Sequence, residues 1–286
     1  MSHNTITERT YRDKYRLATL DTNLRYAMVA EKVCLVDRSE VKRIDSPYGN
    51  QPTATVSALT GTYTVSEWTV TDDYLQVTDE FKFAEHIYDF EEALTDFDLF
   101  ASRTDEMMYS VAYAIDYWVI NNLCEAGNAT YTTPAGGFTT ASNINVIMSN
   151  LLSKVMGYAD VYKGLFLIIE AADTVGFTQA QATNGFSFAD AALKNGFMAS
   201  YMGVDVYVVK DSTFASETKG TTAYTNSGHR VFGVKGVATY AAPRGIKIEE
   251  KGVTGKTGKE VVVYGYCGFK LWTTKQNLVV DITVTA

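Results

Sequence analysis

The C-terminal stretch EVVVYGYCGFKLWTTKQNLVVDITVTA, from Glu260 to Ala286, constrains the fold more than any other part of the chain. It is rich in the β-branched and aromatic residues that favour strands, and it carries few charges. Chain ends are normally poorly ordered unless a sheet or a core holds them. The stretch therefore predicts terminal strands that are built into the centre of the molecule.

A second constraint is a long helical pattern that begins near Asp89. Asp89 and Glu92 have the spacing of an N-terminal cap, and Gly127 is a suitable stop. The apolar residues recur at three- and four-residue steps: Phe90, Leu94, Phe97, Phe100, Met108, Val111, Ile115, Trp118 and Leu123. The pattern predicts a helix over about residues 89–125, which would be about 55 Å long at 1.5 Å per residue.

The remaining patterns predict a mixture of strands and helices, so the coarse fold class is α+β. One helix is expected over 144–158, after a loop over 132–142, and Ala-rich helical pieces follow residue 170. Further strands are expected over 60–72, 75–83, 164–170 and 202–211, and in the segments that run from Arg230 to Trp272.

The segment TGTYTVSEWTVTD alternates with the period of a strand, but each of its faces is half polar. Tyr63 and Val65 share one face, and Trp68 and Val70 share the other. A two-stranded ribbon is marginal alone, and a turn signal at Tyr48 and Gly49 precedes it. Trp68 could cap the core of its own subunit; burial against another subunit fits the half-polar faces better.

Charge and cysteine content exclude several classes of protein. The net charge is −8, which argues against a protein that grips nucleic acid through phosphates. From Glu67 to Glu106 thirteen acidic residues face only Lys82 and Arg103. The three cysteines are scattered, as is typical of reduced thiols in a cytoplasm. We find neither a signal-peptide pattern nor the roughly 18 continuous apolar residues of a membrane span.

The sequence contains no convincing active site. Gly255-Lys256-Thr257 resembles the end of a phosphate-binding loop, but Glu250 stands where that loop needs glycine, and a strand follows instead of a helix. The histidines, His3, His86 and His229, lack the spacing of a zinc motif. The carboxylates between residues 79 and 98 could include an acid/base pair; a solvated helix face is the simpler interpretation.

Four stretches, in their order along the chain, resemble the major capsid protein family of tailed bacteriophages, whose fold is shared with encapsulin shells. These stretches are LQVTDEFKFAEHIYDFEEALTDFD, SVAYAIDYWVINNLCEAG with Ala112 and Asp116, NGFMASYMGVDVYVVKDS, and EVVVYGYCGFKLWTTKQNLVVDITV. The resemblance covers essentially the whole chain. It implies an N-terminal arm, an extended β-hairpin loop, a long spine helix, a peripheral domain and an axial domain.

The resemblance also divides the chain. Residues 1–36 would be the arm and 37–78 the extended loop. The peripheral domain would comprise 79–142, which include the spine helix, together with 241–263. The axial domain would comprise 143–240 and 264–286, with the last strands tied to the strands near Gly164 and Val204.

The function that the resemblance implies is a coat protein that is neither an enzyme nor a binder of cofactors or metals. It would assemble with itself, through pentamers and hexamers, into an icosahedral or prolate head around double-stranded DNA, without sequence-specific DNA contacts and without a membrane. Contacts between subunits would use aromatic residues of the arm and loop: Tyr11, Tyr15, Tyr48, Tyr63 and Trp68. An acidic, DNA-repelling face would carry Glu91, Glu92, Asp96 and Asp98.

The expected location is the virion, after assembly in the host cytoplasm, and the further partners would be portal and decoration proteins. Many family members begin with a cleaved scaffolding segment; the start at Met1-Ser2 favours a separate scaffolding protein instead. Lys42 alone gives no warrant for covalent crosslinking. Two alternatives stay open: an encapsulin-like shell protein, and a monomeric β-rich virion or carbohydrate-binding protein. An enzyme ranks third.

Overall fold

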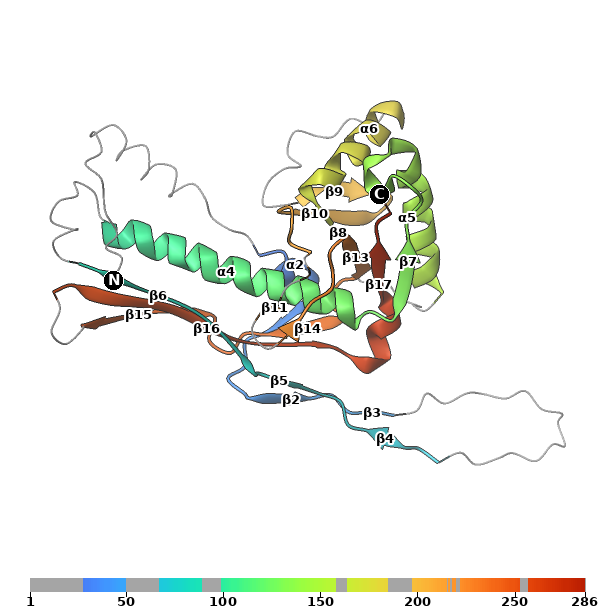
Figure 1. The fold of residues 1–286 in the computed structure, drawn as a ribbon. Helices are drawn as coiled ribbons and strands as arrows, with labels where there is room; N and C mark the ends of the chain where they lie inside the picture. Colours follow the sequence, from blue (N-terminus) through green and yellow to red (C-terminus); the bar gives the residue numbers. More distant parts are fainter. Residues whose placement is uncertain are drawn as a thin grey trace, which may run out of the picture.

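The computed structural model describes residues 28–49, 67–88, 99–157, 164–184, 197–214, 216, 218–219, 222–252 and 257–285. Figure 1 shows a compact lobe, an elongated part that runs along one long helix, and a thin ribbon that leaves the body. Helices and strands are mixed along the chain, so the α+β prediction is confirmed.

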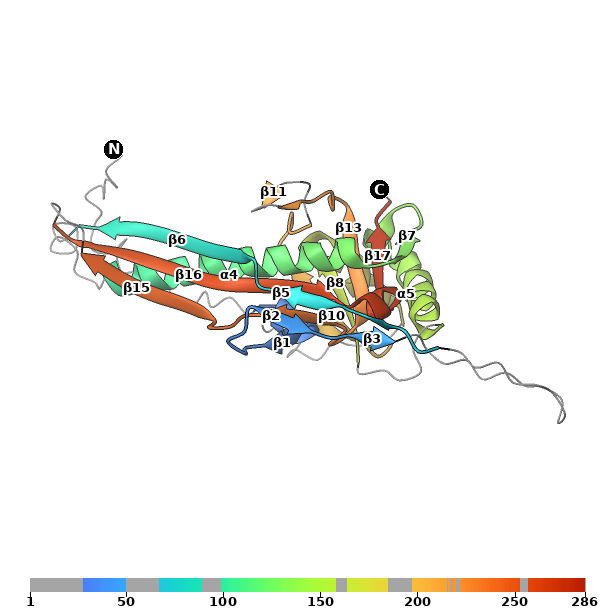
Figure 2. The same ribbon diagram turned by 90° about the horizontal axis from the view of Figure 1, so that it is seen from below.

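The elongated part is a sheet that lies along helix α4 (Leu99–Ala126), and we call it the long sheet (Figures 1 and 2). Trp118 of α4 packs edge-on against Phe81 and Phe269 of the sheet, at ring-centroid distances of 5.6 and 6.4 Å. Aromatic pairs in this geometry add to the gain from apolar burial. The strand order is β1 (Leu35–Asp37), β14 (Ala238–Ala241), β16 (Lys259–Leu271) and β15 (Ile246–Gly252), and β6 (Asp79–Ile87) also pairs with β16.

The compact lobe contains a six-stranded sheet. Residues 165–169 of its strand β8 are all buried, so both faces of the sheet are covered. Helix α5 (Ala141–Met156) packs against it and buries five apolar residues, and α6 (Thr174–Asn184) packs on α5. The strand order is β7 (Ala129–Thr132), β17 (Val279–Thr283), β13 (His229–Val234), β8 (Leu165–Glu170), β10 (Val204–Val209) and β9 (Phe197–Tyr201).

The end of the chain lies inside this sheet, as the sequence predicts. Strand β17 pairs antiparallel with β13 and parallel with β7. Its residues Val279, Val280 and Ile282 are fully buried. The predicted tie to the strands near Gly164 and Val204 is indirect, because β13 lies between β17 and β8. The terminal strand is therefore held by hydrogen bonds on both of its sides.

Short elements complete the described fold. The thin ribbon joins β2 (Arg43–Asp45) to β5 (Tyr74–Gln76) and β3 (Tyr48–Gly49) to β4 (Val70–Thr71). Helix α2 (Ala30–Val33) precedes β1 and buries Val33. The other pieces are β11 (Thr218–Lys219), β12 (Thr222–Ala223) and the 3₁₀ turns η1 (Gly137–Thr139), η2 (Ala171–Asp173) and η3 (Thr273–Leu278).

Several expected boundaries differ from the observed ones. The strand expected over 75–83 is two strands, β5 and β6, and Phe83 is exposed although Leu75 is buried. The long helix ends at Ala126 as expected. Its expected start, with the cap at Asp89, lies outside the described residues, and so does most of the strand expected over 60–72. In that range only Val70 and Thr71 are described as strand.

The division into domains stays a prediction, and the structure shows where its boundaries fall. The boundaries after residues 36, 240 and 263 fall inside β1, β14 and β16. Residues 29, 30, 33 and 34 are buried in the body. Strand β16 pairs continuously with its neighbours across residue 263. The peripheral and axial parts therefore share strands.

Two further features concern the cysteines and the helices that the structure describes. Cys34, Cys124 and Cys267 are all buried, and none of them forms a disulfide. Among the helices that the structure describes, none combines the length and apolar composition that a bilayer-spanning segment needs.

Candidate functional site

The root of the ribbon is fixed to the body by one buried leucine and one buried carboxylate. Leu75 of β5 is almost fully buried and lies against Gly268 of β16, where a Cβ would be within 3.0 Å of the leucine side chain. Asp73 accepts a hydrogen bond of 2.9 Å from the Thr273 amide and pairs with the Lys270 ammonium, also at 2.9 Å. These contacts hold the ribbon where it leaves the long sheet.

Beyond its root the ribbon exposes large apolar side chains. Trp68 is 75% exposed, and Val70 and Tyr74 are also exposed. The indole of Trp68 lies over Gly49 on the opposite strand, where any Cβ would collide with it. The guanidinium of Arg43 lies 4.1 Å from the centre of the Tyr74 ring. Such a concentration of apolar surface on a thin ribbon is typical of a segment that binds a partner.

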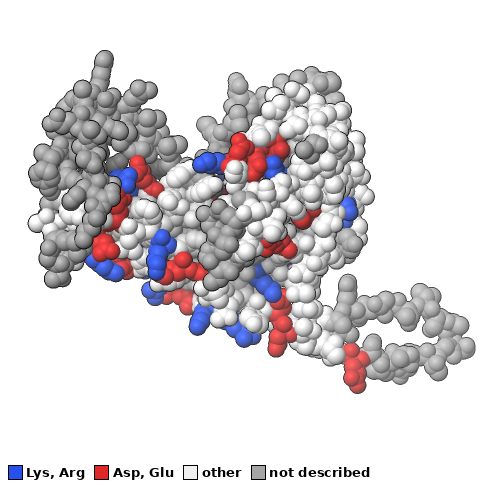
Figure 3. All heavy atoms as spheres, viewed as in Figure 1, with Lys and Arg blue, Asp and Glu red and all other residues white. Residues whose placement is uncertain are grey.

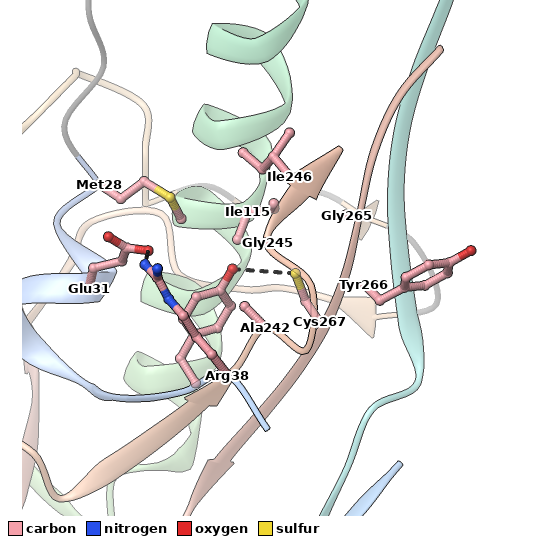
Figure 4. Close-up of a pocket in the computed structure, with 11 residues that line it drawn as sticks. Met28, Glu31, Arg38, Ile115, Ala242, Gly245, Ile246, Gly265, Tyr266 and Cys267 are labelled. Atoms are coloured by element: carbon pink, nitrogen blue, oxygen red, sulfur yellow. Dashed lines mark hydrogen bonds and ion pairs between the residues drawn. The ribbon is translucent and has the colours of Figure 1, made fainter. Parts of the chain in front are cut away.

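A cavity of about 230 Å³ lies between helix α2, helix α4 and β16 (Figure 4). Tyr240 and Cys267 face each other in it, with the hydroxyl 3.4 Å from the sulfur. Burial raises the pKa of the Cys267 thiol to about 11 and also raises the pKa of Tyr240. Both groups stay protonated at neutral pH, so this pair does not supply a nucleophile.

The ion pair between Glu31 and Arg38 lies among the residues that line the same cavity, at 3.3 Å. Both partners are substantially exposed, and exposed pairs of this kind are worth little. Met28, Ile115 and Ile246 supply apolar lining. The cavity therefore combines an apolar wall with an ordinary surface ion pair.

The outside of the long sheet carries paired charges of both signs. Lys82 and Glu80, Lys251 and Glu249, and Lys259 and Glu250 form exposed ion pairs at 3.2 to 3.5 Å. Figure 3 shows basic and acidic side chains next to each other along this edge of the molecule. In the predicted acidic segment, Arg103 pairs with Glu85 at 2.8 Å and also with Glu106. Here the acidic groups are partly neutralised by neighbours.

No protein-family model and no curated protein matches the sequence. Solved structures do match. A capsid structure of the cyanophage P-SCSP1u has a TM-score of 0.71 at 13% identity, over 100% of this chain and 92% of that one. A structure from Mycobacterium phage Che8 has a TM-score of 0.67 at 13% identity, over 98% of both chains. The chain has the phage capsid fold.

The same fold occurs in particles of other origin. A virus-like particle from Pyrococcus furiosus matches with a TM-score of 0.59 at 11% identity, over 96% of this chain and 100% of that one. Helix α4 corresponds to the long spine helix of the predicted fold, and the described ribbon lies within residues 37–78, the range predicted as the extended loop. Both parts were predicted from the sequence, and the structure supplies their packing.

The predicted contact residues are only partly within the described chain. Tyr48 and Trp68 lie together at β3 and just before β4, with Tyr48 half-buried and Trp68 exposed. The other predicted residues lie outside the described ranges: Tyr11, Tyr15, Tyr63, Glu91, Glu92, Asp96 and Asp98. Val70 and Tyr74 were not among the predicted contacts. The alternation that placed Val70 beside Trp68 could have indicated the first of them.

The attachment of the ribbon should weaken in acid. Burial of the Asp73 carboxylate opposes its ionisation, but the Thr273 amide and the Lys270 ammonium hold its pKa below the usual value. A lowered pKa means that the stabilisation is present at neutral pH and is lost as the pH falls through that pKa. In the variant Asp73→Asn we expect the β5 amides to exchange hydrogen about tenfold faster at pH 7, because a hydrogen bond to a charged group contributes about 1.5–3 kcal/mol.

The measurement is hydrogen exchange followed by mass spectrometry, with Asp72→Asn as the control because Asp72 is exposed. Equal exchange in the two variants at pH 7 would show that Asp73 does not hold the ribbon.

Proposed function

We propose that this chain is the major capsid protein of a tailed bacteriophage, which assembles through pentamers and hexamers into an icosahedral or prolate head around double-stranded DNA. The observation that carries the proposal is the capsid fold over the whole chain, with a likeness that spans 98% of both chains for the Che8 structure. The exposed ribbon supports it, because a ribbon with so little core of its own needs a surface to lie on.

Assembly would be driven by the free energy of contacts between subunits and not by a chemical reaction. Each subunit presents the ribbon to a neighbour and receives a ribbon in turn, and closed symmetry repeats these contacts around the shell. Trp68 is suited to be an anchor, because tryptophan is enriched among the residues that dominate binding energy. The body of the subunit, with α4 packed on the long sheet, would remain rigid while the ribbon adjusts to pentamers and hexamers.

The net charge and the fold also bear on what the shell would enclose and on which proteins would join it. A net charge of −8 disfavours tight phosphate binding, so packaged DNA would be confined without sequence-specific contacts. The acidic face at Glu91, Glu92, Asp96 and Asp98 would repel it. Self-association builds the shell, and a separate scaffolding protein, a portal and decoration proteins would complete the head. The protein would act without a reaction or a cofactor, in the virion after assembly in the host cytoplasm.

An encapsulin-like shell is the second candidate, and the likeness to the Pyrococcus furiosus particle is the observation in its favour. The fold alone does not show whether a shell encloses cargo enzymes or DNA. The decisive experiment is light scattering of the purified protein, followed by electron microscopy of the same fraction and of particles recovered from the source. Closed shells or discrete pentamers and hexamers are expected, with double-stranded DNA in the native particles. A strict monomer, even with candidate scaffolding proteins from the same source, would overturn the proposal.

Replacing Trp68 with alanine should impair assembly far more than it affects folding. Because the indole is 75% exposed in the subunit, its loss should change the free energy of unfolding by less than about 1 kcal/mol. An interface anchor is worth about 2 kcal/mol or more, so the critical concentration for assembly should rise at least about tenfold. Light scattering measures assembly, and urea denaturation of the unassembled subunit measures stability.

Leu75→Ala is the matched control, because Leu75 belongs to the same ribbon but is buried at its root. Loss of a buried leucine should lower the stability of the subunit itself by about 2–5 kcal/mol. If Trp68→Ala costs as much stability as Leu75→Ala, Trp68 belongs to the core of its own subunit.

A further inference from the structure

Cys124, His229 and Asp281 are far apart in the sequence, and the fold brings their side chains together. Cys124 lies in the last turn of α4, His229 is the first residue of β13, and Asp281 is in the middle of β17. In the β13–β17 pairing, His229 is opposite Thr283 and Val231 is opposite Asp281. His229 and Asp281 are thus diagonal neighbours on one face of the sheet, the face on which α4 places Cys124.

The three donor atoms are close enough to share one ion. Sγ of Cys124 is 3.1 Å from Oδ1 of Asp281, and Nδ1 of His229 is 2.8 Å from the same oxygen. All three ligand atoms lie within 4.8 Å of one another. In a tetrahedral zinc site with bonds of about 2.0–2.3 Å, ligand atoms are separated by about 3.5 Å. Small adjustments of these side chains would place the three donor atoms around one cation.

We propose that Cys124, His229 and Asp281 form a binding site for a zinc-type divalent cation, with a fourth position open to water. Sulfur, imidazole nitrogen and carboxylate oxygen together form a donor set that suits zinc. The site is reachable, since the side chains of His229 and Asp281 are 25% and 19% exposed. Cys124 closes the inner side of the site, being almost fully buried.

The charges around the cluster favour a divalent ion. With Cys124 as a thiolate, the nearby groups are two further anions, Asp281 and Glu125, and one cation, Arg230. Because Arg230 is itself paired with Glu170 and Asp173, the groups around the cluster are net negative, which favours a cation. Arg230 donates a 2.6 Å hydrogen bond to the backbone oxygen of His229 and is held by its own carboxylates, so it does not occupy the position of the ion.

Metal binding would exchange protons in a defined way. Without a metal, the Cys124 thiol donates a hydrogen bond of 3.1 Å to Oδ1 of Asp281. The cation replaces that proton, which leaves to solvent. Nδ1 of His229, which lies 2.8 Å from Oδ1 of Asp281, would turn its lone pair to the ion. Cation binding at this site therefore releases the thiol proton of Cys124.

The consequence for the subunit would be a clamp between the spine helix and the terminal strand. The ion would join the end of α4 to β17 and β13, so folding stability would rise with the concentration of free metal. The alternative is a hydrogen-bonded triad that holds the same elements without any ion. The metal site would take up one divalent cation, whereas the hydrogen-bonded triad would take up none.

Cobalt titration of the full-length, chelator-treated protein tests the proposal, because cobalt bound to a thiolate gives a charge-transfer absorption band. The wild-type protein should bind one Co²⁺ per subunit, show this band, and release the cobalt when Zn²⁺ is added. Cys124→Ser should lose the band. Cys267→Ser is the matched control, because Cys267 is equally buried and lies outside the cluster; it should keep the band.

Asp281→Asn provides a second variant that leaves the thiol in place. It should bind cobalt at least about tenfold more weakly, and Zn²⁺ should raise its melting temperature less than that of the wild type. The proposal is overturned if the wild type takes up no cobalt, or if Cys124→Ser keeps the band. Both readouts are independent of shell assembly.

Discussion

Replacing Arg230 with methionine is expected to lower the free energy of unfolding of the subunit by about 3–5 kcal/mol, the usual cost of breaking a buried ion pair from one side. Arg230 is buried in β13 and binds Glu170 at 2.9 Å and Asp173 through Nε. Methionine fills most of the same space but leaves both carboxylates without their cation. Since whole domains are stable by only about 5–15 kcal/mol, this is a large fraction of the total.

The loss should depend on pH. Burial raises the pKa of Glu170 despite the opposing charge of Arg230. Without Arg230 this pKa rises further, so the folded variant binds a proton that the unfolded chain does not. For a carboxyl group with a raised pKa, stability is higher at low pH and falls as the pH rises through that pKa. The difference between variant and wild type should therefore be smaller at pH 5 than at pH 8.

Urea denaturation of the unassembled subunit at both pH values measures this effect, and Arg38→Met is the matched control. Arg38 also pairs with a glutamate, but its side chain is 69% exposed, and its replacement should change stability by less than about 0.5 kcal/mol. Similar losses in the two variants would mean that burial of the Arg230 cluster is not what makes its ion pairs costly to break.

The locally encoded parts of this fold could be predicted from the sequence. Helix α5 was expected over 144–158 and is found at Ala141–Met156, because its apolar residues recur with helical spacing. The long helix ends one residue before Gly127, where a glycine stop was expected. Strand β8 was visible as an uninterrupted apolar run. The ribbon was indicated by a strand pattern whose two faces are both half polar.

The parts that depend on pairing across the chain could not be predicted in this way. Nothing local marks residue 263 as the middle of one continuous strand, because β16 changes partners from β15 and β6 to β14 without a break in its own pattern. The cluster of Cys124, His229 and Asp281 is assembled by the register of β13 and β17. Histidine spacing along the sequence carries no signal of it.

Asp116 illustrates the same limit and leads to the second large effect. The sequence singles it out through the Ala112–Asp116 pattern of the spine helix, but not through its partners. In the structure its buried carboxylate accepts hydrogen bonds of 3.1 Å from the Val29 amide and 2.6 Å from the Ala30 amide. Asp116 thus caps the start of α2 although it lies 86 residues after Ala30 in the chain. The described part of the N-terminal segment is fixed to the spine helix at this point.

Asp116→Ala should lower the free energy of unfolding by about 3–5 kcal/mol, because two hydrogen bonds to a charged group, worth about 1.5–3 kcal/mol each, are lost and two buried amides lose their acceptor. Asp116→Asn should cost roughly half as much, since the amide oxygen can still accept one hydrogen bond. Denaturation gives the totals, and hydrogen exchange at Val29 and Ala30 locates the effect. Asp105→Ala, at an exposed position of the same helix, controls for the helix itself. If the Val29 and Ala30 amides exchanged no faster in Asp116→Ala than in Asp105→Ala, the carboxylate would not be the anchor of α2, and the link between spine helix and N-terminal segment would have to rest on apolar packing alone.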